Sequence, residues 1–218
     1  MRKFPLVKDE IYHIYNRSIA KYQIFNTTAE FSRMRKLFSY YQRGEKKQRF
    51  SEWEKRKNVI PEKEDLETKK ANKLVSIIAY CIMPTHFHLI LKQLKDKGIS
   101  VFISQISNSY TRYFNLKHKR KGPLWEREFQ NVLVSTDEQL LHLTRYIHLN
   151  PVTAFLADKP EDWEFSSYRE YLGEIEEGDR ICRFEDILDI MPEEYKAFVN
   201  DRISYQRELE KIKYLIME

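Results

Sequence analysis

Apolar residues recur along the chain at strand-like and helix-like spacings, and the order of these segments predicts the fold. Strands are expected over residues 11–17, 74–83, 86–92 and 129–135. Helices are expected to begin at Thr27 or Thr28, after Gly98, and at Thr136 or Asp137, with the last one stopped near Asn150 by Pro151. The order βαββαβ followed by a helix fits an α+β, ferredoxin-like fold, in which helices pack on one face of an antiparallel sheet.

Charge is distributed unevenly along the chain and suggests how it is divided. Residues 1–155 hold 29 Lys and Arg against 15 Asp and Glu, a balance of +14, whereas residues 156–218 hold 9 against 18, a balance of −9. We therefore expect a basic main domain over residues 1–155, with a charged insertion at about 43–73, and an acidic helical extension over 156–218. A basic domain attracts phosphate backbones, although a merely soluble basic surface is the alternative.

Other features of the composition narrow the class of protein. No apolar run approaches the ~18 residues that span a bilayer, so no contact with a membrane and a cytoplasmic location are expected. Cys81 and Cys182 lack the spacing of a metal-binding or redox motif, so both are expected to be reduced thiols.

Two histidines, His86 and His88, stand on either side of Phe87 in a predicted strand. Strand geometry places both imidazoles on one face, ~7 Å apart, and Phe87 on the other. Such a pair can hold one divalent ion, but histidines at this spacing are more often surface or hydrogen-bonded core residues. The pair alone is a weak signal.

The last predicted helix carries Tyr146 at the edge of its apolar stripe, with Asn150 one turn later. A lone tyrosine there is commonly a rim aromatic, but its hydroxyl can also act as a nucleophile when a metal assists. The Asn150 carbonyl oxygen can supply a third ligand beside His86 and His88. This mixed nitrogen and oxygen set suits Mg²⁺ or Mn²⁺ better than structural Zn²⁺.

A basic loop follows the second long helix and combines cations with an indole, as grooves for single-stranded nucleic acid do. The alternative is a solvated loop with one buried tryptophan. The candidate DNA-binding residues are Lys117, Lys119, Arg120, Lys121, Trp125 and Arg127.

Several of these segments occur together in one known family. In their order along the chain and in their places on the predicted strands and helices, these segments resemble the single-tyrosine HUH transposases, including the REP-associated tyrosine transposases. The resemblance covers roughly residues 8–155 and continues into the segment after the last helix. It is carried by Tyr12-His-Ile-Tyr-Asn-Arg17, Thr85-His-Phe-His-Leu-Ile90, Gly122-Pro-Leu-Trp125, Arg145-Tyr-Ile-His-Leu-Asn-Pro-Val152 and Asp162-Trp-Glu-Phe-Ser-Ser-Tyr168.

The resemblance implies a DNA transposase that cuts and rejoins single-stranded DNA. His86 and His88 would hold the metal, and Tyr146 would attack a phosphodiester to leave a 5′-phosphotyrosine and a free 3′-OH. Asn150 stands where some members use glutamine as a further ligand. Hairpin DNA is the implied substrate, and a homodimer stays open.

Two other functions compete with this interpretation. One is a binding module: a sheet of the same topology that has no catalytic residues can bind RNA or single-stranded DNA through exposed aromatic residues. A metal-dependent phosphodiesterase that uses water would need His86 and His88 but not Tyr146.

Overall fold

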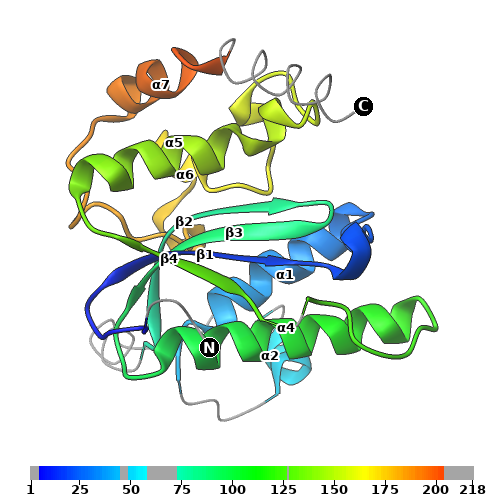
Figure 1. The fold of residues 1–218 in the computed structure, drawn as a ribbon. Helices are drawn as coiled ribbons and strands as arrows, with labels where there is room; N and C mark the ends of the chain where they lie inside the picture. Colours follow the sequence, from blue (N-terminus) through cyan, green and yellow to red (C-terminus); the bar gives the residue numbers. More distant parts are fainter. Residues whose placement is uncertain (1–4, 45–48, 58–72, 127, 204–218) are drawn as a thin grey trace.

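The computed structural model describes residues 5–44, 49–57, 73–126 and 128–203. Its main elements follow the predicted order along the chain (Figure 1). They are β1 (Ile11–Arg17), α1 (Thr28–Tyr41), α2 (Phe50–Lys57), β2 (Val75–Met83), β3 (His86–Gln93), α4 (Gly98–Lys117), β4 (Gln130–Val134), α5 (Asp137–Thr153), α6 (Tyr168–Tyr171) and α7 (Pro192–Asn200). Short 3₁₀ turns lie at Ile19–Lys21, Pro160–Asp162 and Glu177–Asp179.

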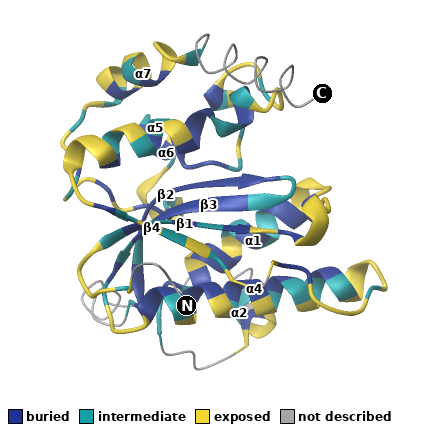
Figure 2. Ribbon diagram, in the orientation of Figure 1, coloured by how far each residue is buried: buried dark blue, intermediate teal, exposed yellow. Residues whose placement is uncertain are grey.

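The four strands form an antiparallel sheet in the order β2-β3-β1-β4. Helices α1 and α4 cover one face, whereas α5 lies across the other face with α7 beyond it (Figure 1). The short α6 lies against β2, where the Tyr171 hydroxyl donates to the Ile78 carbonyl. The predicted ferredoxin-like fold is therefore confirmed, with the last long helix on the face opposite α1 and α4. Because both faces are covered, β2 and β3 are buried over most of their length (Figure 2).

Helix α1 begins where the sequence predicts, because Thr27 and Glu30 form a capping box at its first turn. Thr27 is the N-cap residue, and the Glu30 carboxylate accepts hydrogen bonds from the backbone N–H groups of Asn26 (2.7 Å) and Thr27 (3.2 Å). These contacts satisfy N–H groups that a helix start otherwise leaves unpaired.

Helix α5 differs from the prediction at its end. It begins at Asp137 behind the Thr136 cap, whose hydroxyl accepts a hydrogen bond from the Gln139 N–H, but it continues through Pro151 to Thr153. The prediction that Pro151 stops the helix is wrong. A proline inside a helix loses its own N–H hydrogen bond and crowds the carbonyl four residues earlier. Because Pro151 lies two residues before the end of α5, only the last turn is affected, and that turn is closed by the Ala154 N–H, which donates to the Asn150 carbonyl at 2.9 Å.

The described part of the extension runs along the outer edge of β2. The Ile82 N–H donates to the Phe165 carbonyl, the Ser167 N–H to the Tyr80 carbonyl, and the Arg183 N–H to the Ile77 carbonyl, each at 2.9 Å. Residues of the extension also share the main core, among them Tyr168, Tyr171, Cys182 and Tyr195. The division at residue 155 stays a prediction, as does the role of the charged insertion, of which α2 is described and 58–72 lie outside the described residues.

None of the described helices is both long and apolar enough to cross a membrane.

Candidate active site

The two histidines of β3 face the helix α5 side of the sheet. In the antiparallel register with β1, His86 lies opposite Arg17 and His88 opposite Tyr15. Phe87 points to the other face, where its ring packs against Phe38 and Trp125. The strand alternation predicted for this segment is confirmed.

Both histidines are held through the same ring nitrogen. His88 Nδ1 shares a 2.9 Å hydrogen bond with Nε2 of His13, a residue of β1, and the two rings stack with centroids 5.1 Å apart. His86 Nδ1 shares a 2.9 Å hydrogen bond with the hydroxyl of Thr85. No contact within the described residues occupies Nε2 of either ring, so both Nε2 atoms can serve as ligands.

Burial keeps these imidazoles uncharged near neutral pH. It lowers the pKa of His13 to about 4, and burial together with the Arg17 charge lowers the pKa of His86 to about 4. Burial, reinforced by the neighbouring His13 and His86, also holds the pKa of His88 well below its usual value. The neutral imidazole is the form that binds a metal.

Helix α5 brings Tyr146 to these histidines. The tyrosine ring stands edge-on to His88 and His13, with centroid distances of 6.0 and 6.4 Å, and 45% of the residue is exposed. Asn150, one turn later, donates from its side-chain amide to the Tyr146 carbonyl at 3.1 Å and keeps its own Oδ1 as an acceptor. The structure thus places Tyr146 beside His88 and His13, and Asn150 on the following turn.

A second tyrosine, Tyr15, lies in the same place and was missed by the sequence analysis. Its ring centroid is 5.8 Å from that of His88 and 5.6 Å from that of His13, and the Arg17 guanidinium lies 5.6 Å from it. The one signal for Tyr15 in the sequence is that it lies two residues after His13 in a predicted strand, so both side chains are on the same face. The site therefore holds two tyrosines within reach of one histidine.

No three His, Cys, Asp and Glu side chains are grouped to hold a metal in the part of the chain that the structure describes. A metal here would need a further ligand beside the two Nε2 atoms, and the role of Asn150 as that ligand stays a prediction.

His148 lies on the buried side of α5, facing away from Tyr146. Its Nδ1 shares a 2.6 Å hydrogen bond with the Tyr195 hydroxyl of α7, and its Nε2 shares a 2.7 Å hydrogen bond with the Ser167 hydroxyl. Ser167 in turn accepts from the Tyr80 N–H of β2 at 2.9 Å. We call these four residues the α5 anchor, because they fix the tyrosine helix to both α7 and the edge of the sheet.

The predicted DNA-binding cations are only partly available. Lys119 and Lys121 are exposed, but Lys117 donates to the buried Glu30 carboxylate at 2.8 Å. Burial raises the pKa of Glu30, but hydrogen bonds from Lys117, Asn26 and His118 outweigh it and lower the pKa to about 2. The charge of Lys117 is therefore already paired.

Two other residues of the loop hold its structure. The Arg120 guanidinium donates to Asn115 Oδ1 and to the Pro123 carbonyl, at 3.0 and 2.7 Å. Trp125 is 8% exposed, and its indole N–H donates to the Ser107 carbonyl at 3.2 Å. The Trp125 ring is therefore buried and is not exposed for stacking on a nucleic-acid base. This agrees with the alternative given above, a solvated loop with one buried tryptophan. Arg127 lies outside the described residues.

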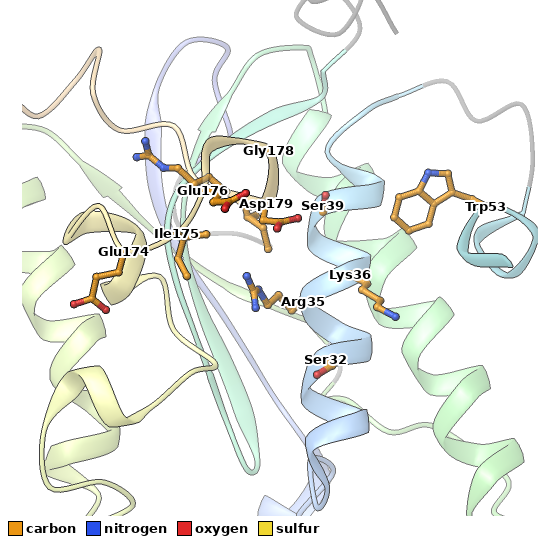
Figure 3. A pocket seen from close by; sticks show the side chains of 12 residues that line it. Ser32, Arg35, Lys36, Ser39, Trp53, Glu174, Ile175, Glu176, Gly178 and Asp179 are labelled. Carbon is orange, nitrogen blue, oxygen red and sulfur yellow. The ribbon is translucent and has the colours of Figure 1, made fainter. Parts of the chain in front are cut away.

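A cavity of about 430 Å³ lies elsewhere, between α1, Trp53 of α2 and the loop 174–181 (Figure 3). Its lining includes the cations Arg35, Lys36 and Arg180 and the carboxylates of Glu174, Glu176 and Asp179. It contains none of the predicted site residues.

Comparison with known proteins shows what this chain is similar to. Residues 45–150 match the family model described as "Transposase IS200 like". A Haemophilus influenzae protein that carries the name REP-associated tyrosine transposase is 28% identical over 101 residues, which are 42% of this chain and 57% of that protein. The resemblance to tyrosine transposases is confirmed. This chain thus spans less than two thirds of that curated tyrosine transposase.

A solved structure of a REP-associated tyrosine transposase bound to a REP hairpin shares the fold, with a TM-score of 0.54 and 17% identity over 79% of this chain and 85% of the other. The IS200-like match begins within the charged insertion and ends at Asn150, so it contains His86, His88 and Tyr146. His13 and Tyr15, on β1, lie outside it.

Proposed function

We propose that this protein is a tyrosine transposase that cleaves and rejoins single-stranded DNA through Tyr146. The observation that carries the proposal is the edge-on approach of the Tyr146 ring to the paired rings of His88 and His13, at 6.0 and 6.4 Å. The family resemblance supports the same reaction class.

In this reaction the Tyr146 hydroxyl attacks the phosphorus of a phosphodiester. A bond forms between its oxygen and phosphorus, the bond from phosphorus to the 3′ oxygen breaks, the hydroxyl proton is released, and the departing oxygen takes up a proton as the 3′-OH. The DNA stays attached as a 5′-phosphotyrosine, and a 3′-OH that attacks this linkage restores a phosphodiester and the free tyrosine.

The residues present fit a divalent metal. His86 and His88 each keep Nε2 unpaired among the described contacts, and Asn150 adds an amide oxygen, a mixed set that suits Mg²⁺ or Mn²⁺. When bound, the ion would polarise the phosphodiester and neutralise charge that develops on it. The side chain of Tyr146 is partly exposed, so it is accessible to a DNA strand that lies across α5 and β3.

Hairpin DNA is the proposed substrate. The similar solved transposase is bound to a REP hairpin, and the first 155 residues of this chain carry a formal charge of +14. Among the described cations of the basic loop, Lys119 and Lys121 are exposed and suited to phosphate contacts.

The test is formation of a covalent adduct. The protein is incubated with an end-labelled DNA hairpin carrying a single-stranded flank, with Mg²⁺ or Mn²⁺, and resolved under denaturing conditions. We expect an adduct with the wild type and none with Tyr146→Phe, whereas Tyr22→Phe, which alters an exposed tyrosine away from the histidines, is the matched control.

Three outcomes would overturn parts of the proposal. An adduct that persists in Tyr146→Phe but is lost in Tyr15→Phe would move the nucleophile to β1. Cleavage without any adduct, insensitive to Tyr146→Phe, would indicate a hydrolase that uses water. Hairpin binding with neither adduct nor cleavage would indicate a binding module.

A further inference from the structure

His13 has a defined contact that the reaction above does not use. It projects from β1 to the same side of the sheet as His88 and lies diagonally across from it, since its partner in the strand register is Ile90. Its Nε2 stands 2.9 Å from His88 Nδ1, with the ring planes only 20° apart. The contact links β1 to one of the two histidines of β3.

A hydrogen bond between two imidazole nitrogens needs one N–H and one lone pair, so only two arrangements are possible. In the first, His88 Nδ1 carries the hydrogen and donates to His13 Nε2, which leaves a lone pair on His88 Nε2. In the second, His13 Nε2 donates, and the hydrogen of His88 then sits on its own Nε2. Only the first arrangement leaves His88 able to bind a metal through Nε2.

The neighbouring histidine is held in a matching way. His86 contacts the Thr85 hydroxyl through Nδ1 at 2.9 Å, and a hydroxyl can accept a hydrogen bond from an Nδ1–H group. Thus both rings of the pair have a local partner at Nδ1, and both direct their remaining nitrogen away from that partner. Histidine ligands of metals commonly donate their other ring N–H to an outer partner in this manner, which fixes the tautomer and the rotation of the ring.

We propose that His13 is a positioning residue that accepts a hydrogen bond from His88 Nδ1–H and so keeps the His88 Nε2 lone pair free for a divalent ion. This inference rests on the proposed function for the identity of the ligand, but the hydrogen bond itself exists without metal or DNA. His13 does not bind the ion itself, because its Nε2 lone pair accepts from His88 and its Nδ1 then carries the hydrogen.

The hydrogen bond is tested on the metal-free full chain, labelled with ¹⁵N at histidine. Long-range ¹H–¹⁵N correlation spectra distinguish the two neutral tautomers. We expect His88 as the Nδ1–H tautomer in the wild type and a mixture of tautomers in His13→Ala. A wild-type His88 with its hydrogen on Nε2 would overturn the proposal, even if the Tyr146 adduct forms.

Metal affinity gives a second measurement that does not depend on DNA cleavage. In a Mn²⁺ titration followed by electron paramagnetic resonance, His13→Ala should weaken binding by about 10- to 100-fold, the usual effect of removing an outer partner. His13→Gln should recover most of the affinity, since its amide oxygen can accept from Nδ1–H. His142→Ala, which removes an exposed histidine of α5, is the matched control and should leave the affinity unchanged.

The pattern of the variants separates positioning from direct ligation. If His13→Gln binds as weakly as His13→Ala, the imidazole itself is the ligand and the proposal is wrong. If neither variant changes the affinity, His13 does not position His88. Wild-type protein that binds no Mn²⁺ would refute the metal role in the proposed function, while the spectra of the metal-free protein would still decide the tautomer.

Discussion

The α5 anchor predicts a stability change that can be measured apart from any reaction. Tyr195→Phe removes only the hydroxyl that contacts His148 Nδ1 at 2.6 Å, and both residues are fully buried. The variant creates almost no cavity, but it leaves a buried ring nitrogen without its partner. Leaving a buried polar group unpaired costs about 1–3 kcal/mol.

For a chain of this length, such a loss lowers the melting temperature by about 2–12 °C, since 1 kcal/mol corresponds to about 2–4 °C. Thermal unfolding followed by circular dichroism measures the shift. Tyr22→Phe removes a solvent-exposed hydroxyl and should stay within about 0.5 kcal/mol of the wild type.

The same variant should also reduce the rate of adduct formation, because α5 carries Tyr146 and the anchor fixes this helix to α7. A melting temperature equal to that of Tyr22→Phe would show that the hydroxyl contributes nothing to the stability of the fold. A large fall in melting temperature with an unchanged adduct rate at a temperature where the variant is fully folded would refute the link from the anchor to the nucleophile.

Three further predictions follow from individual contacts. Burial lowers the pKa of His148 to about 3, so below about pH 6.5 the unfolded chain binds a proton that the folded chain excludes. The free energy of unfolding should therefore fall between pH 6.5 and pH 3, by up to about 1.4 kcal/mol per pH unit from this group. Urea unfolding at several pH values measures this slope, which should be shallower in a His148 variant that still folds. Gly98→Ala should lower the free energy of unfolding in urea by about 1–3 kcal/mol, since an added Cβ would lie 2.3 Å from the Leu74 carbonyl oxygen. An unchanged free energy of unfolding would contradict this close contact between Gly98 and Leu74. Lys119→Ala and Lys121→Ala should each reduce the salt dependence of single-stranded DNA binding by about 0.7 in the log–log slope. Lys117→Ala should mainly lower thermal stability, because it removes one of the partners of the buried Glu30 carboxylate; equal effects of all three variants on the slope would contradict this division.

The elements of the fold were predictable because local patterns determine them. The alternation of Ile11–Arg17 gives a strand with those bounds, and Thr27, one of the two predicted caps, marks the start of α1. The spacing of His86 and His88 predicted a common face for the same reason, since strand geometry alone requires it.

The contacts that complete the site could not be predicted in this way. The distance from His13 to His88 depends on the register between β1 and β3, and a shift of one residue would turn His13 to the other face. Lys117 is paired with Glu30, which lies 87 residues earlier, so the loop's own composition could not reveal that its charge is neutralised.

Trp125 and Pro151 show the same limit for single residues. An indole in a basic loop fits a base or a core equally well, and contacts with Phe87 and Ser107, both distant in sequence, place it in the core. A proline usually ends or kinks a helix, but Pro151 sits in the last turn of α5, which ends two residues later at Thr153.

The hydrogen bonds between β2 and the segment 163–183 have a consequence for synthesis of the chain. Strand β2 is apolar and almost entirely buried, and the residues that cover its outer edge emerge from the ribosome about 100 residues later, or roughly 5–20 s at usual rates of elongation. During that interval its edge is an unpaired template to which a strand from another nascent chain can add. We therefore expect the segment 163–183 to protect the chain against aggregation once it has covered this edge, and chains shortened before residue 163 to accumulate in inclusion bodies.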